Sequence, residues 1–459
     1  MKLEYLKSFS NSFEEYTELR LQENKKVSLV LVNGNLVNNI RTTKGGISAR
    51  VYKDGVFGFA STPVIDEQSV KGVISKAKEN AYILDNIEKK AKGSLFEEGF
   101  EIIKDFSTKK NRVSRRDMLD YLQALHSYTQ EKYPDLVSNT FVLNNLDMEK
   151  NLLSSFGTSA YTMIPRNILM LFFSYEKDGE IYESFDTMGG LGQFEDFFNE
   201  PEKIYNKIES LYKKVREKSE GVYPEAGYHD VILDSKLAGI LAHEAIGHTT
   251  EADLVKSGSI AKDYLNEKVA SEIVSLVDFA HEYKGMTCPV PIFVDDEGTR
   301  PEDVVIIKDG ILKRYMNNKV FANDFGDRPT GNARAFDFSD EPLVRMRNTA
   351  ILPGKDKLED MISSIDKGYY LIDTNNGQAD STSEFMFGIT CAYEIKDGKL
   401  GPAIKDTTIS GVAFDMLKTV SMISDDMFWS NSGMCGKKQM IPVGMGGPAI
   451  KCKINIGGK

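Results

Sequence analysis

Residues 219–248 read SEGVYPEAGYHDVILDSKLAGILAHEAIGH and place a junction, a strand and a helix in immediate succession. The segment Ser219–Gly227 combines glycine, proline and charge, which is typical of a connection between domains. A short apolar strand, His229–Leu233, follows it, and Asp234 or Ser235 is suited to cap the helix that comes next. This order predicts a domain boundary at the junction, with a strand and a helix opening the second domain.

The boundary divides the chain into an N-terminal domain, residues 1–220, and a C-terminal domain, residues 221–459. In the N-terminal part, Asn33-Gly34 and Asp54-Gly55 stand between segments rich in β-branched and apolar residues, which predicts two hairpins. Val70–Ile83 repeats apolar residues at helical spacing and is expected to be an amphipathic helix.

Further helices and strands follow in blocks rather than in strict alternation. Ser114-Arg-Arg-Asp predicts a helix that begins with a capping box, and a charged helix is expected at about Glu202–Lys218. The C-terminal half is rich in strand-like segments that are separated by the turns Asp309-Gly310, Pro353-Gly354 and Asp397-Gly398. We therefore expect an α+β fold of two domains, a mixed N-terminal one and a strand-rich C-terminal one that carries the helix described above.

Composition narrows the choice of partners and compartment. The 459 residues include 57 Lys+Arg and 68 Asp+Glu, and the net charge of −11 argues against nucleic acid or an anionic membrane as the main partner. The longest apolar run, Ile168–Phe173, is far shorter than the roughly 20 residues of a membrane span, and the first twenty residues contain no signal-peptide core. The four cysteines show no CxxC spacing, so we expect a soluble protein of a reducing compartment, the cytoplasm.

Two of the five histidines lie in one short stretch, His243-Glu-Ala-Ile-Gly-His248. Familiar zinc peptidases use HExxH, because a spacing of i, i+4 places both imidazoles on one helix face. Here the spacing is i, i+5, which separates the two side chains by roughly 140° on a regular helix. Gly247 directly precedes the second histidine and permits a π-bulge or local unwinding, so we expect an irregular helix between Glu244 and His248.

The spacing alone leaves two interpretations open. In the first, the histidines bind a metal ion together with a third protein ligand. The candidates for that ligand are Glu251, Asp253, the acidic cluster Asp295–Glu297 and the cysteines, and spacing does not choose between them. In the second, the helix merely contains two hydrogen-bonded histidines and an exposed Glu244.

Several separated segments of the chain resemble motifs of a known protein family, and this resemblance bears on the choice between these interpretations. Two of them are His243–Asp253 (HEAIGHTTEAD) and Gly46–Ala60 (GISARVYKDGVFGFA). The others are Asp295–Thr299, Gly331–Arg334, Arg345–Thr349, Asn376–Gln378, Gly433–Lys437 and Pro442–Pro448. Taken together, in their order along the chain, these segments resemble the TldD/PmbA family of zinc metallopeptidases, which has also been labelled modulator of DNA gyrase.

The resemblance implies one zinc ion per chain, bound by His243, His248 and Cys435, with Glu244 as the catalytic carboxylate. Two neutral imidazoles and one thiolate leave a net charge of +1, and such a centre still lowers the pKa of water towards about 7. Glu244 directly follows a ligand, so it is placed to accept a proton from water and pass it to the leaving amine. Because the chain keeps all these residues, it resembles the catalytic, TldD-like members rather than their metal-free partners.

Two departures from the family pattern lie close to the implied site. The cysteine segment, Cys435–Gln439 (CGKKQ), is one residue shorter than the usual C-G-K-x-G-Q, and Arg347 replaces a threonine. Neither change removes an implied metal ligand. Arg334, Arg345 and Asn348 are candidates for binding the substrate, although residues of this kind often hold loops together instead.

The preferred prediction is a cytoplasmic zinc-dependent peptidase that hydrolyses peptides or unfolded polypeptide segments. The resemblance implies a dimer that encloses the site, either a homodimer or a heterodimer with a metal-free paralogue. Two other classes remain open: a non-catalytic regulatory protein of the gyrase-modulator type with a structural metal, and a redox or metal-storage protein. A structural site needs no general base, so Glu244 distinguishes the first, and the absence of CxxC argues against the second.

Overall fold

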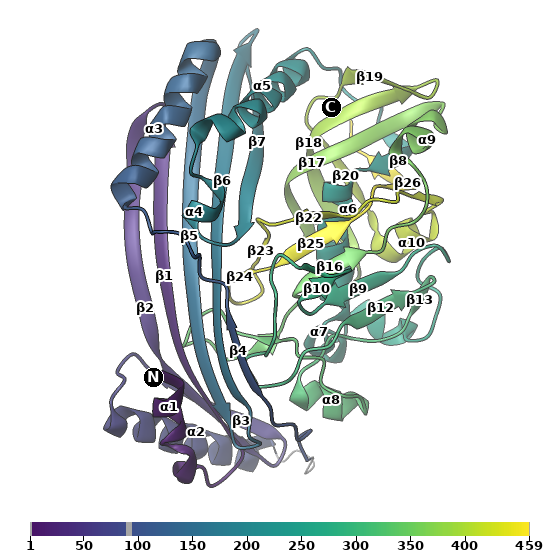
Figure 1. The fold of residues 1–459 in the computed structure, drawn as a ribbon. Coiled ribbons are helices and arrows are strands. Elements are labelled where there is room, and N and C mark those ends of the chain that lie inside the picture. The colour runs from purple at the N-terminus through teal and green to yellow at the C-terminus, as the bar shows by residue number, and fades with distance from the viewer. Residues whose placement is uncertain (1, 89–93, 459) are drawn as a thin grey trace.

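The computed structural model describes residues 2–88 and 94–458, and it has the α+β fold that the sequence predicts (Figure 1). A long, curved sheet from the N-terminal part of the chain lies beside a block of smaller sheets and helices from the C-terminal part. Among the described residues, no helix combines the length and apolar character needed to cross a membrane.

The N-terminal sheet has seven strands in the order β3-β2-β1-β5-β6-β4, with β7 also paired to β6. All pairs are antiparallel except β4 with β6. The strands are β1 (Thr17–Val32), β2 (Asn35–Lys53), β3 (Val56–Thr62), β4 (Glu101–Asp105), β5 (Leu136–Ser154), β6 (Ser159–Lys177) and β7 (Glu180–Leu191).

Tight turns fix the register of the first three strands. Asn33 and Gly34 both have positive φ angles, 47° and 78°, as do Asp54 and Gly55, at 42° and 100°. Positive φ at two successive residues is what a two-residue hairpin turn requires, and Asn-Gly and Asp-Gly adopt it readily. Val32 accordingly pairs with Asn35, and Lys53 with Val56. Both predicted hairpins are confirmed.

Helices cover this sheet: α1 (Lys2–Lys7), α2 (Glu67–Glu88), α3 (Arg115–Lys132), α4 (Phe194–Phe197) and α5 (Tyr205–Ser219), with 3₁₀ turns η1 (Ser10–Ser12) and η2 (Pro201–Ile204). The residues that α2 buries are those that its periodicity predicts, namely Val70, Val73, Ile74, Ala77 and Ala81. The capping box of α3 forms between Ser114 and Asp117, as predicted. The charged helix expected from Glu202 instead begins as the turn η2 and becomes α-helical at Tyr205.

The C-terminal block contains two larger sheets. In the first, β17 (Lys367–Ala379), β8 (Gly227–Leu233), β26 (Ile450–Ile456), β20 (Thr407–Val412) and β18 (Glu384–Lys396) form a closed ring, because β17 also pairs with β18. Its other strands are β19 (Lys399–Ala403) and β21 (Met422–Ile423). The second comprises β13 (Ile311–Leu312), β12 (Val304–Lys308), β9 (Leu276–Phe279), β16 (Asn348–Ile351), β25 (Gly444–Gly447) and β22 (Phe428–Ser430).

Three short hairpins and several helices complete the block. The hairpins are β10 (Glu282–Tyr283) with β11 (Met286–Thr287), β14 (Ala333–Arg334) with β15 (Leu343–Val344), and β23 (Met434–Cys435) with β24 (Ile441–Pro442). The helices are α6 (Ser235–Leu241), η3 (Ala242–Gly247), η4 (His248–Thr250), α7 (Ala252–Lys256), η5 (Ile260–Tyr264), α8 (Lys319–Phe325), α9 (Leu358–Ser363) and α10 (Ala413–Lys418).

The segment α6–η3 packs against both larger sheets. Asp234 caps α6 through its side chain, which accepts a hydrogen bond from the backbone N–H of Lys236. Leu237, Leu241 and Ile246 are fully buried, in one core with residues from the ring and from the second sheet. Burying such side chains stabilises the fold by about 1.5–3 kcal/mol each. The helix that carries the predicted metal-binding histidines is therefore held from two sides.

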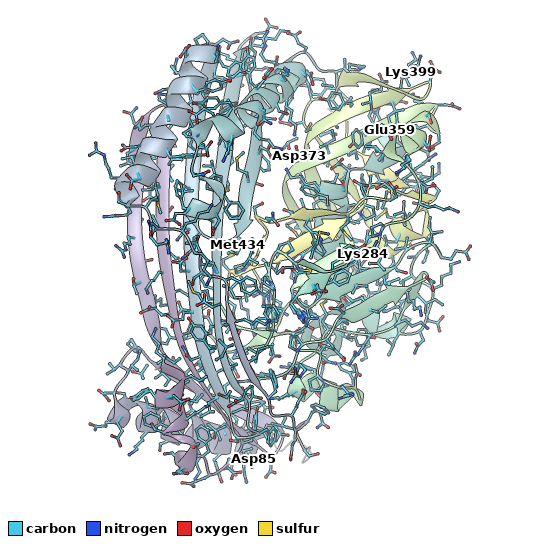
Figure 2. The ribbon with its side chains drawn as sticks, in the orientation of Figure 1. Asp85, Lys284, Glu359, Asp373, Lys399 and Met434 are labelled. Atoms are coloured by element: carbon cyan, nitrogen blue, oxygen red, sulfur yellow. The ribbon has the colours of Figure 1, made fainter. Side chains whose placement is uncertain are left out.

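The two blocks meet along a surface rich in charge. Lys214 of α5 donates to Asp373 of β17, and Met434 of β23 lies where the blocks face each other (Figure 2). The strands of the long sheet end at Leu191, α5 ends at Ser219, and β8 opens the C-terminal block at Gly227. The proposed boundary at residue 220 falls between these last two elements and stays a prediction.

Candidate metal centre

A π-helical turn brings the two histidines to the same side of their helix. The α-helix α6 becomes a π-helix, η3, at Ala242, and the 3₁₀ turn η4 begins at His248. The backbone N–H of His248 donates to the carbonyl of His243, which is the i→i−5 bond of a π-helix. This wider turn matches the five-residue spacing, and the ring centroids lie 5.2 Å apart. The predicted irregularity is confirmed.

Gly247 permits this turn through its small size. Its φ of −56° and ψ of −52° are ordinary right-handed values, which any residue adopts. A Cβ atom here would lie 2.0 Å from the Sδ of Met346. The π-turn predicted at Gly247 is present, but it does not use the conformational freedom of glycine. The helix instead packs too closely on Met346 to leave room for a side chain.

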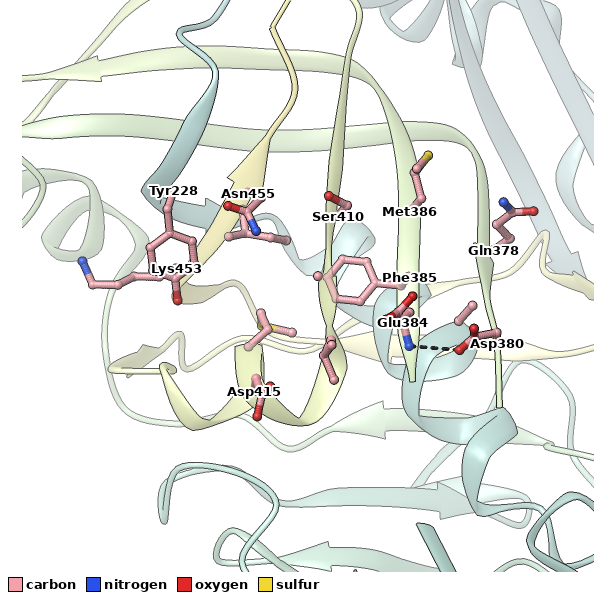
Figure 3. A pocket seen from close by; sticks show the side chains of 15 residues that line it. Tyr228, Gln378, Asp380, Glu384, Phe385, Met386, Ser410, Asp415, Lys453 and Asn455 are labelled. Carbon is pink, nitrogen blue, oxygen red and sulfur yellow. Dashed lines mark hydrogen bonds between the residues drawn. The ribbon is translucent and has the colours of Figure 1, made fainter. Parts of the chain in front are cut away.

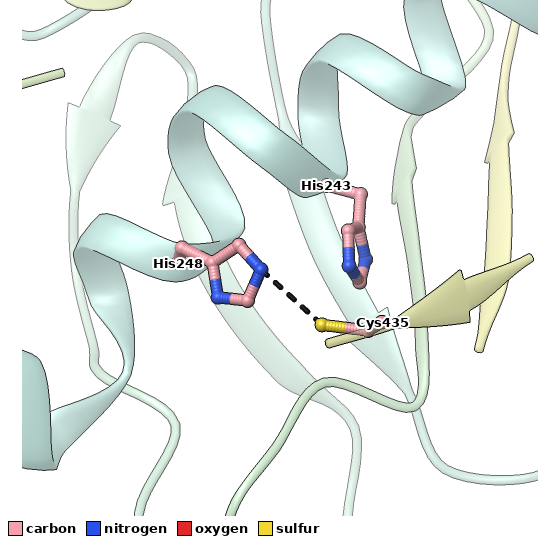
Figure 4. A group of neighbouring side chains, drawn as sticks. All are labelled: His243, His248 and Cys435. Atoms are coloured by element: carbon pink, nitrogen blue, oxygen red, sulfur yellow. Dashed lines mark hydrogen bonds between the residues drawn. The ribbon is translucent and has the colours of Figure 1, made fainter. Parts of the chain in front are cut away.

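Cys435 reaches the histidines from the short hairpin of β23 and β24 (Figure 4). Its Sγ lies 3.2 Å from the Nε2 of His248. One atom each from His243, His248 and Cys435 can serve as a metal ligand, and the three atoms all lie within 4.8 Å of one another. The structure thus brings together the three residues that the family resemblance implies, despite the shortened segment after Cys435.

The donor set suits a metal ion such as zinc. His243 is fully buried, and neither of its ring nitrogens has a hydrogen-bond partner among the described residues. A buried polar group without a partner is costly, by about 1–3 kcal/mol. A cation coordinated by one of these nitrogens would offset that cost, and two imidazoles with one thiol form a ligand set that zinc accepts.

Electrostatics favour the ionised form of the thiol. Burial alone would raise the pKa of Cys435, but the neighbouring His243 and His248 outweigh burial and lower it to about 4. Burial opposes the charged form of His248 as well, yet Glu251 and Cys435 raise the pKa of its imidazole to about 10. We therefore expect the two groups to form a thiolate–imidazolium pair in the metal-free protein, and the thiolate is the form that binds metals.

Two further residues support this arrangement. Glu251 is fully buried, and its Oε2 lies 2.8 Å from the Nδ1 of His248, on the side of the ring away from Cys435. Lys437 donates to the same Oε2 over 3.0 Å. The sequence indicated Glu251 only as one candidate ligand and assigned no role to Lys437. Their places near His248 and Cys435 along the chain, three and two residues away, were the available signals.

The proposed catalytic carboxylate, Glu244, is partly exposed and lies beside the triad. The side chain of Glu244 is 26% exposed, and its Oε2 lies 3.8 Å from the Nε2 of His248. That distance is too long for a hydrogen bond and leaves the carboxylate free to contact a water molecule or a substrate. The side chain of His248 is 22% exposed, so solvent reaches one of the proposed ligands, whereas His243 and Cys435 are buried.

The three candidates for substrate binding are buried and bonded to the backbone. Arg345 donates to the carbonyls of Cys435, Lys437 and Gln439, and so supports the hairpin that carries the thiol. Arg334 donates to the carbonyls of Met346 and Pro442. Asn348 donates to the carbonyls of Phe279, Ala280 and Val290 and accepts from the N–H of Val290. These contacts account for all three residues, and substrate contact stays a prediction.

The departure at Arg347 has a structural explanation. The side chain is fully buried, and its Nε donates over 2.8 Å to Asp278, which is fully buried as well. The guanidinium also donates to the carbonyls of Thr330 and Glu302. Arg347 therefore fastens β16 to β9 and the neighbouring loops.

The other candidate ligands have different partners. Asp253 accepts two hydrogen bonds from Lys437. In the acidic cluster, Asp296 pairs with Arg20 and Lys150 and Glu297 with Arg50, so these carboxylates join the two blocks. An open groove of about 740 Å³ lies at the ends of β18, β20 and β26 and beside α10 (Figure 3). Neither the triad nor Glu244 is among the residues that line it.

Two segments of the chain match models of known protein-family domains, and one of them contains this site. Residues 226–458 match the model of the PmbA/TldA metallopeptidase C-terminal domain. Residues 17–81 match domain 1 of the same family. The chain belongs to the TldD/PmbA family. The C-terminal match spans half of the chain and includes the helix with both histidines and the hairpin with Cys435.

Relatives in the TldD/PmbA family carry metalloprotease names. The metalloprotease TldD homolog of Buchnera aphidicola is 40% identical over 240 residues, which are 51% of this chain and 49% of that protein. This alignment therefore spans only about half of the relative. The zinc metalloprotease TldD homolog of Saccharolobus solfataricus is 29% identical over 422 residues, 90% of each chain.

A solved structure has the same fold over the full length. TldE from Thermococcus kodakarensis aligns with a TM-score of 0.77 and covers 100% of both chains. The sequence identity is 19%, so this likeness concerns the fold.

Proposed function

We propose that this TldD/PmbA chain is a zinc-dependent peptidase of the catalytic, TldD-like kind, acting on peptides or unfolded polypeptide segments. The observation that carries the proposal is that His243, His248 and Cys435 lie together beside the partly exposed carboxylate of Glu244. The metalloprotease names of the relatives support the same reading.

In this proposal His243, His248 and Cys435 hold one zinc ion per chain. When bound, the ion would supply a Lewis acid that polarises a carbonyl and acidifies water. Glu244 would accept the proton of the attacking water and later donate it to the leaving amine. Substrate would approach from the side of the partly exposed Glu244 and His248, because His243 is fully buried.

The number of ligands favours a catalytic centre over a structural one. Structural zinc sites are closed by four protein ligands, whereas catalytic sites have three and leave one position open. The candidate group of described residues consists of three, and Glu244 is not among them. A regulatory protein with a structural metal, the alternative function, would need no partly exposed carboxylate beside the metal.

The assembly and the compartment belong to the proposal as well. A homodimer would contain two triads, and a heterodimer with a metal-free paralogue only one. The outer edge of β2 supports dimerisation, because residues 35–46 pair with β1 only and expose Leu36, Val37 and Ile40. Unpaired edges of this kind readily add a strand from another chain. The four free, buried cysteines support a reducing compartment such as the cytoplasm.

The test is the substitution Glu244→Ala in the zinc-loaded protein, with hydrolysis of a labelled, denatured protein as the assay. We expect activity to fall by at least about 100-fold, the usual contribution of a general acid–base residue, while zinc content stays at the wild-type level. Glu272→Ala, at an exposed glutamate, is the control. Unchanged activity of the Glu244 variant would exclude the proposed mechanism, and a wild-type chain that binds zinc but cleaves nothing would favour the regulatory alternative.

A further inference from the structure

Lys437 joins the hairpin that carries Cys435 to the segment that follows His248. Its Nζ donates to Glu251 Oε2 over 3.0 Å and to both carboxylate oxygens of Asp253 over 3.0 and 2.9 Å. It also donates to the carbonyl of Val344 over 2.6 Å. The lysine side chain is only 13% exposed. Its contacts are therefore fixed by the surrounding protein rather than formed at a mobile surface.

Glu251 is the residue through which this contact reaches the histidine. One oxygen, Oε2, faces both the Nδ1 of His248 and the Nζ of Lys437. The other oxygen is buried and has no partner among the described residues. Burial would raise the pKa of Glu251, but His248, Lys437 and the more distant Arg345 outweigh burial and lower it to about 2, so Lys437 is one of the cations that compensate this buried carboxylate.

The orientation of His248 depends on this carboxylate. Because Glu251 holds Nδ1 as the donor, the opposite nitrogen, Nε2, faces the thiol of Cys435. Carboxylates that hold the far nitrogen of a metal-binding histidine in this way fix its tautomer and its ring orientation. Lys437 lies two residues beyond Cys435, so one ammonium group links the position of the thiol to the orientation of the imidazole.

We infer that Lys437 and Glu251 are positioning residues that hold Cys435 and His248 together in the geometry that binds the metal. The inference rests on the proposed zinc site. It goes beyond that site because neither residue is a ligand and neither touches the reacting atoms. It also explains how a shortened cysteine segment still delivers its thiol, since Lys437 ties the hairpin directly to the segment after His248.

Adjacent lysines provide a matched pair of variants. Lys437→Met removes the ammonium group and keeps the apolar stem, whereas Lys438→Met makes the same change at an exposed neighbour. Zinc affinity is measured by competition with a chromogenic chelator, and the absorption of the Co²⁺-loaded protein reports thiolate coordination. Loss of a residue that orients a ligand typically weakens metal binding 10–100-fold. We expect about that loss and an altered Co²⁺ spectrum for Lys437→Met, but wild-type behaviour for Lys438→Met.

Further variants distinguish positioning from a general structural role. Lys437→Arg keeps the positive charge and should restore part of the affinity, although its planar group does not reproduce all of the contacts. If Lys437→Met does not fold, Glu251→Gln decides, because it keeps the volume and removes the charge that faces His248. A lower melting temperature with unchanged zinc affinity and Co²⁺ spectrum would overturn the inference. Failure of the wild-type chain to bind zinc would instead overturn the proposed function.

Discussion

Cys435 differs from the other three cysteines in its surroundings. Burial raises the pKa of Cys391 to about 11 and that of Cys288 to about 12, and it raises the pKa of Cys452 as well. At Cys435 the same penalty is outweighed by two imidazoles, and the pKa falls to about 4. Cys435, which lies beside His243 and His248, is therefore the cysteine whose surroundings favour the thiolate.

This pair predicts a characteristic pH dependence of stability in the metal-stripped protein. The pKa of Cys435 is lowered from 9.0 to about 4, so the stability that its thiolate contributes is lost as the pH falls from 9.0 towards 4. The pKa of His248 is raised from 6.5 to about 10, so the stability that its imidazolium contributes is lost as the pH rises from 6.5 towards 10. Between pH 6.5 and 9.0 the folded and unfolded states hold equal numbers of protons on this pair, and the contribution is constant.

Urea unfolding of metal-free wild type and of Cys435→Ser, from pH 4 to pH 10, measures that contribution as a difference between the two proteins. We expect the difference to be largest towards the upper end of this pH range and to shrink on both sides, because Glu251 still raises the pKa of His248 in the variant. Cys288→Ser is the control, since burial raises the pKa of that thiol instead of lowering it. A difference that does not vary with pH would show that the thiolate–imidazolium pair does not form.

At the scale of the element, the π-turn η3 is the feature that makes the HExxxH spacing workable. A regular α-helix would direct His243 and His248 about 140° apart, whereas the i→i−5 bond brings them to one side. The turn is held by burial of Ala245 and Ile246 and by the close approach of Gly247 to Met346. Packing from both sheets thus stabilises a conformation that an isolated helix would rarely adopt.

The contact between Gly247 and Met346 predicts that a larger residue at position 247 weakens zinc binding and that a smaller residue at position 346 restores it. Gly247→Ala places a methyl group 2.0 Å from Sδ of Met346, so either the methionine or the π-turn must move. We expect this variant to lose stability by about 1–3 kcal/mol, the usual cost of overpacking, and to bind zinc less tightly. The double variant Gly247→Ala/Met346→Ala should recover zinc affinity relative to Gly247→Ala alone. Chelator competition on the two single variants and the double variant measures the effect, and additive losses would contradict it.

At the scale of the whole molecule, buried charges hold the N-terminal sheet against the C-terminal block. Asp296 pairs with Arg20 of β1, over 3.2 Å, and with Lys150 of β5, over 2.7 Å. Glu297 pairs with Arg50 of β2 over 2.7 Å. Burial lowers the pKa of Lys150 to about 8, even though Asp296 opposes that shift. The acidic cluster, which was one candidate for the metal ligands, therefore acts as a joint between the blocks.

Asp296→Asn should accordingly destabilise the chain much more than a surface substitution. Removing one partner of a buried ion pair costs about 3–5 kcal/mol, because Lys150 and Arg20 lose their buried counter-charge. The cost should be larger at pH 7 than at pH 9, because the pKa of about 8 for Lys150 depends on Asp296, so in the variant Lys150 becomes neutral at a lower pH. Chemical denaturation at pH 7 and pH 9 measures both effects. Asp415→Asn, in an exposed pair with Lys418, is the control and should change stability by no more than about 1 kcal/mol.

Patterns of residues close together in the sequence were sufficient to predict several elements of the fold. Asn33-Gly34 and Asp54-Gly55 predicted their hairpins because only a few residues adopt positive φ easily, and Ser114 predicted the start of α3 through its capping box. The apolar face of α2 followed from its period. The irregular helix followed from the mismatch between five-residue spacing and a regular turn. The turns and the cap depend on interactions among residues close in sequence, and the spacing of residues alone shows the apolar face of α2 and the mismatch at the histidines, although tertiary packing holds the π-turn itself.

Tertiary structure decided what lies beside the helix. Cys435 is 187 residues beyond His248, and only the packing of the β23–β24 hairpin brings the thiol within 3.2 Å of the imidazole. Spacing left Glu251, Asp253, the acidic cluster and the cysteines as equal candidates, and family resemblance, not local pattern, indicated Cys435. The link from Lys437 to Glu251 and the contact between Gly247 and Met346 likewise join segments about a hundred or more residues apart. No local pattern records such contacts, because they exist only once the sheets have enclosed the helix.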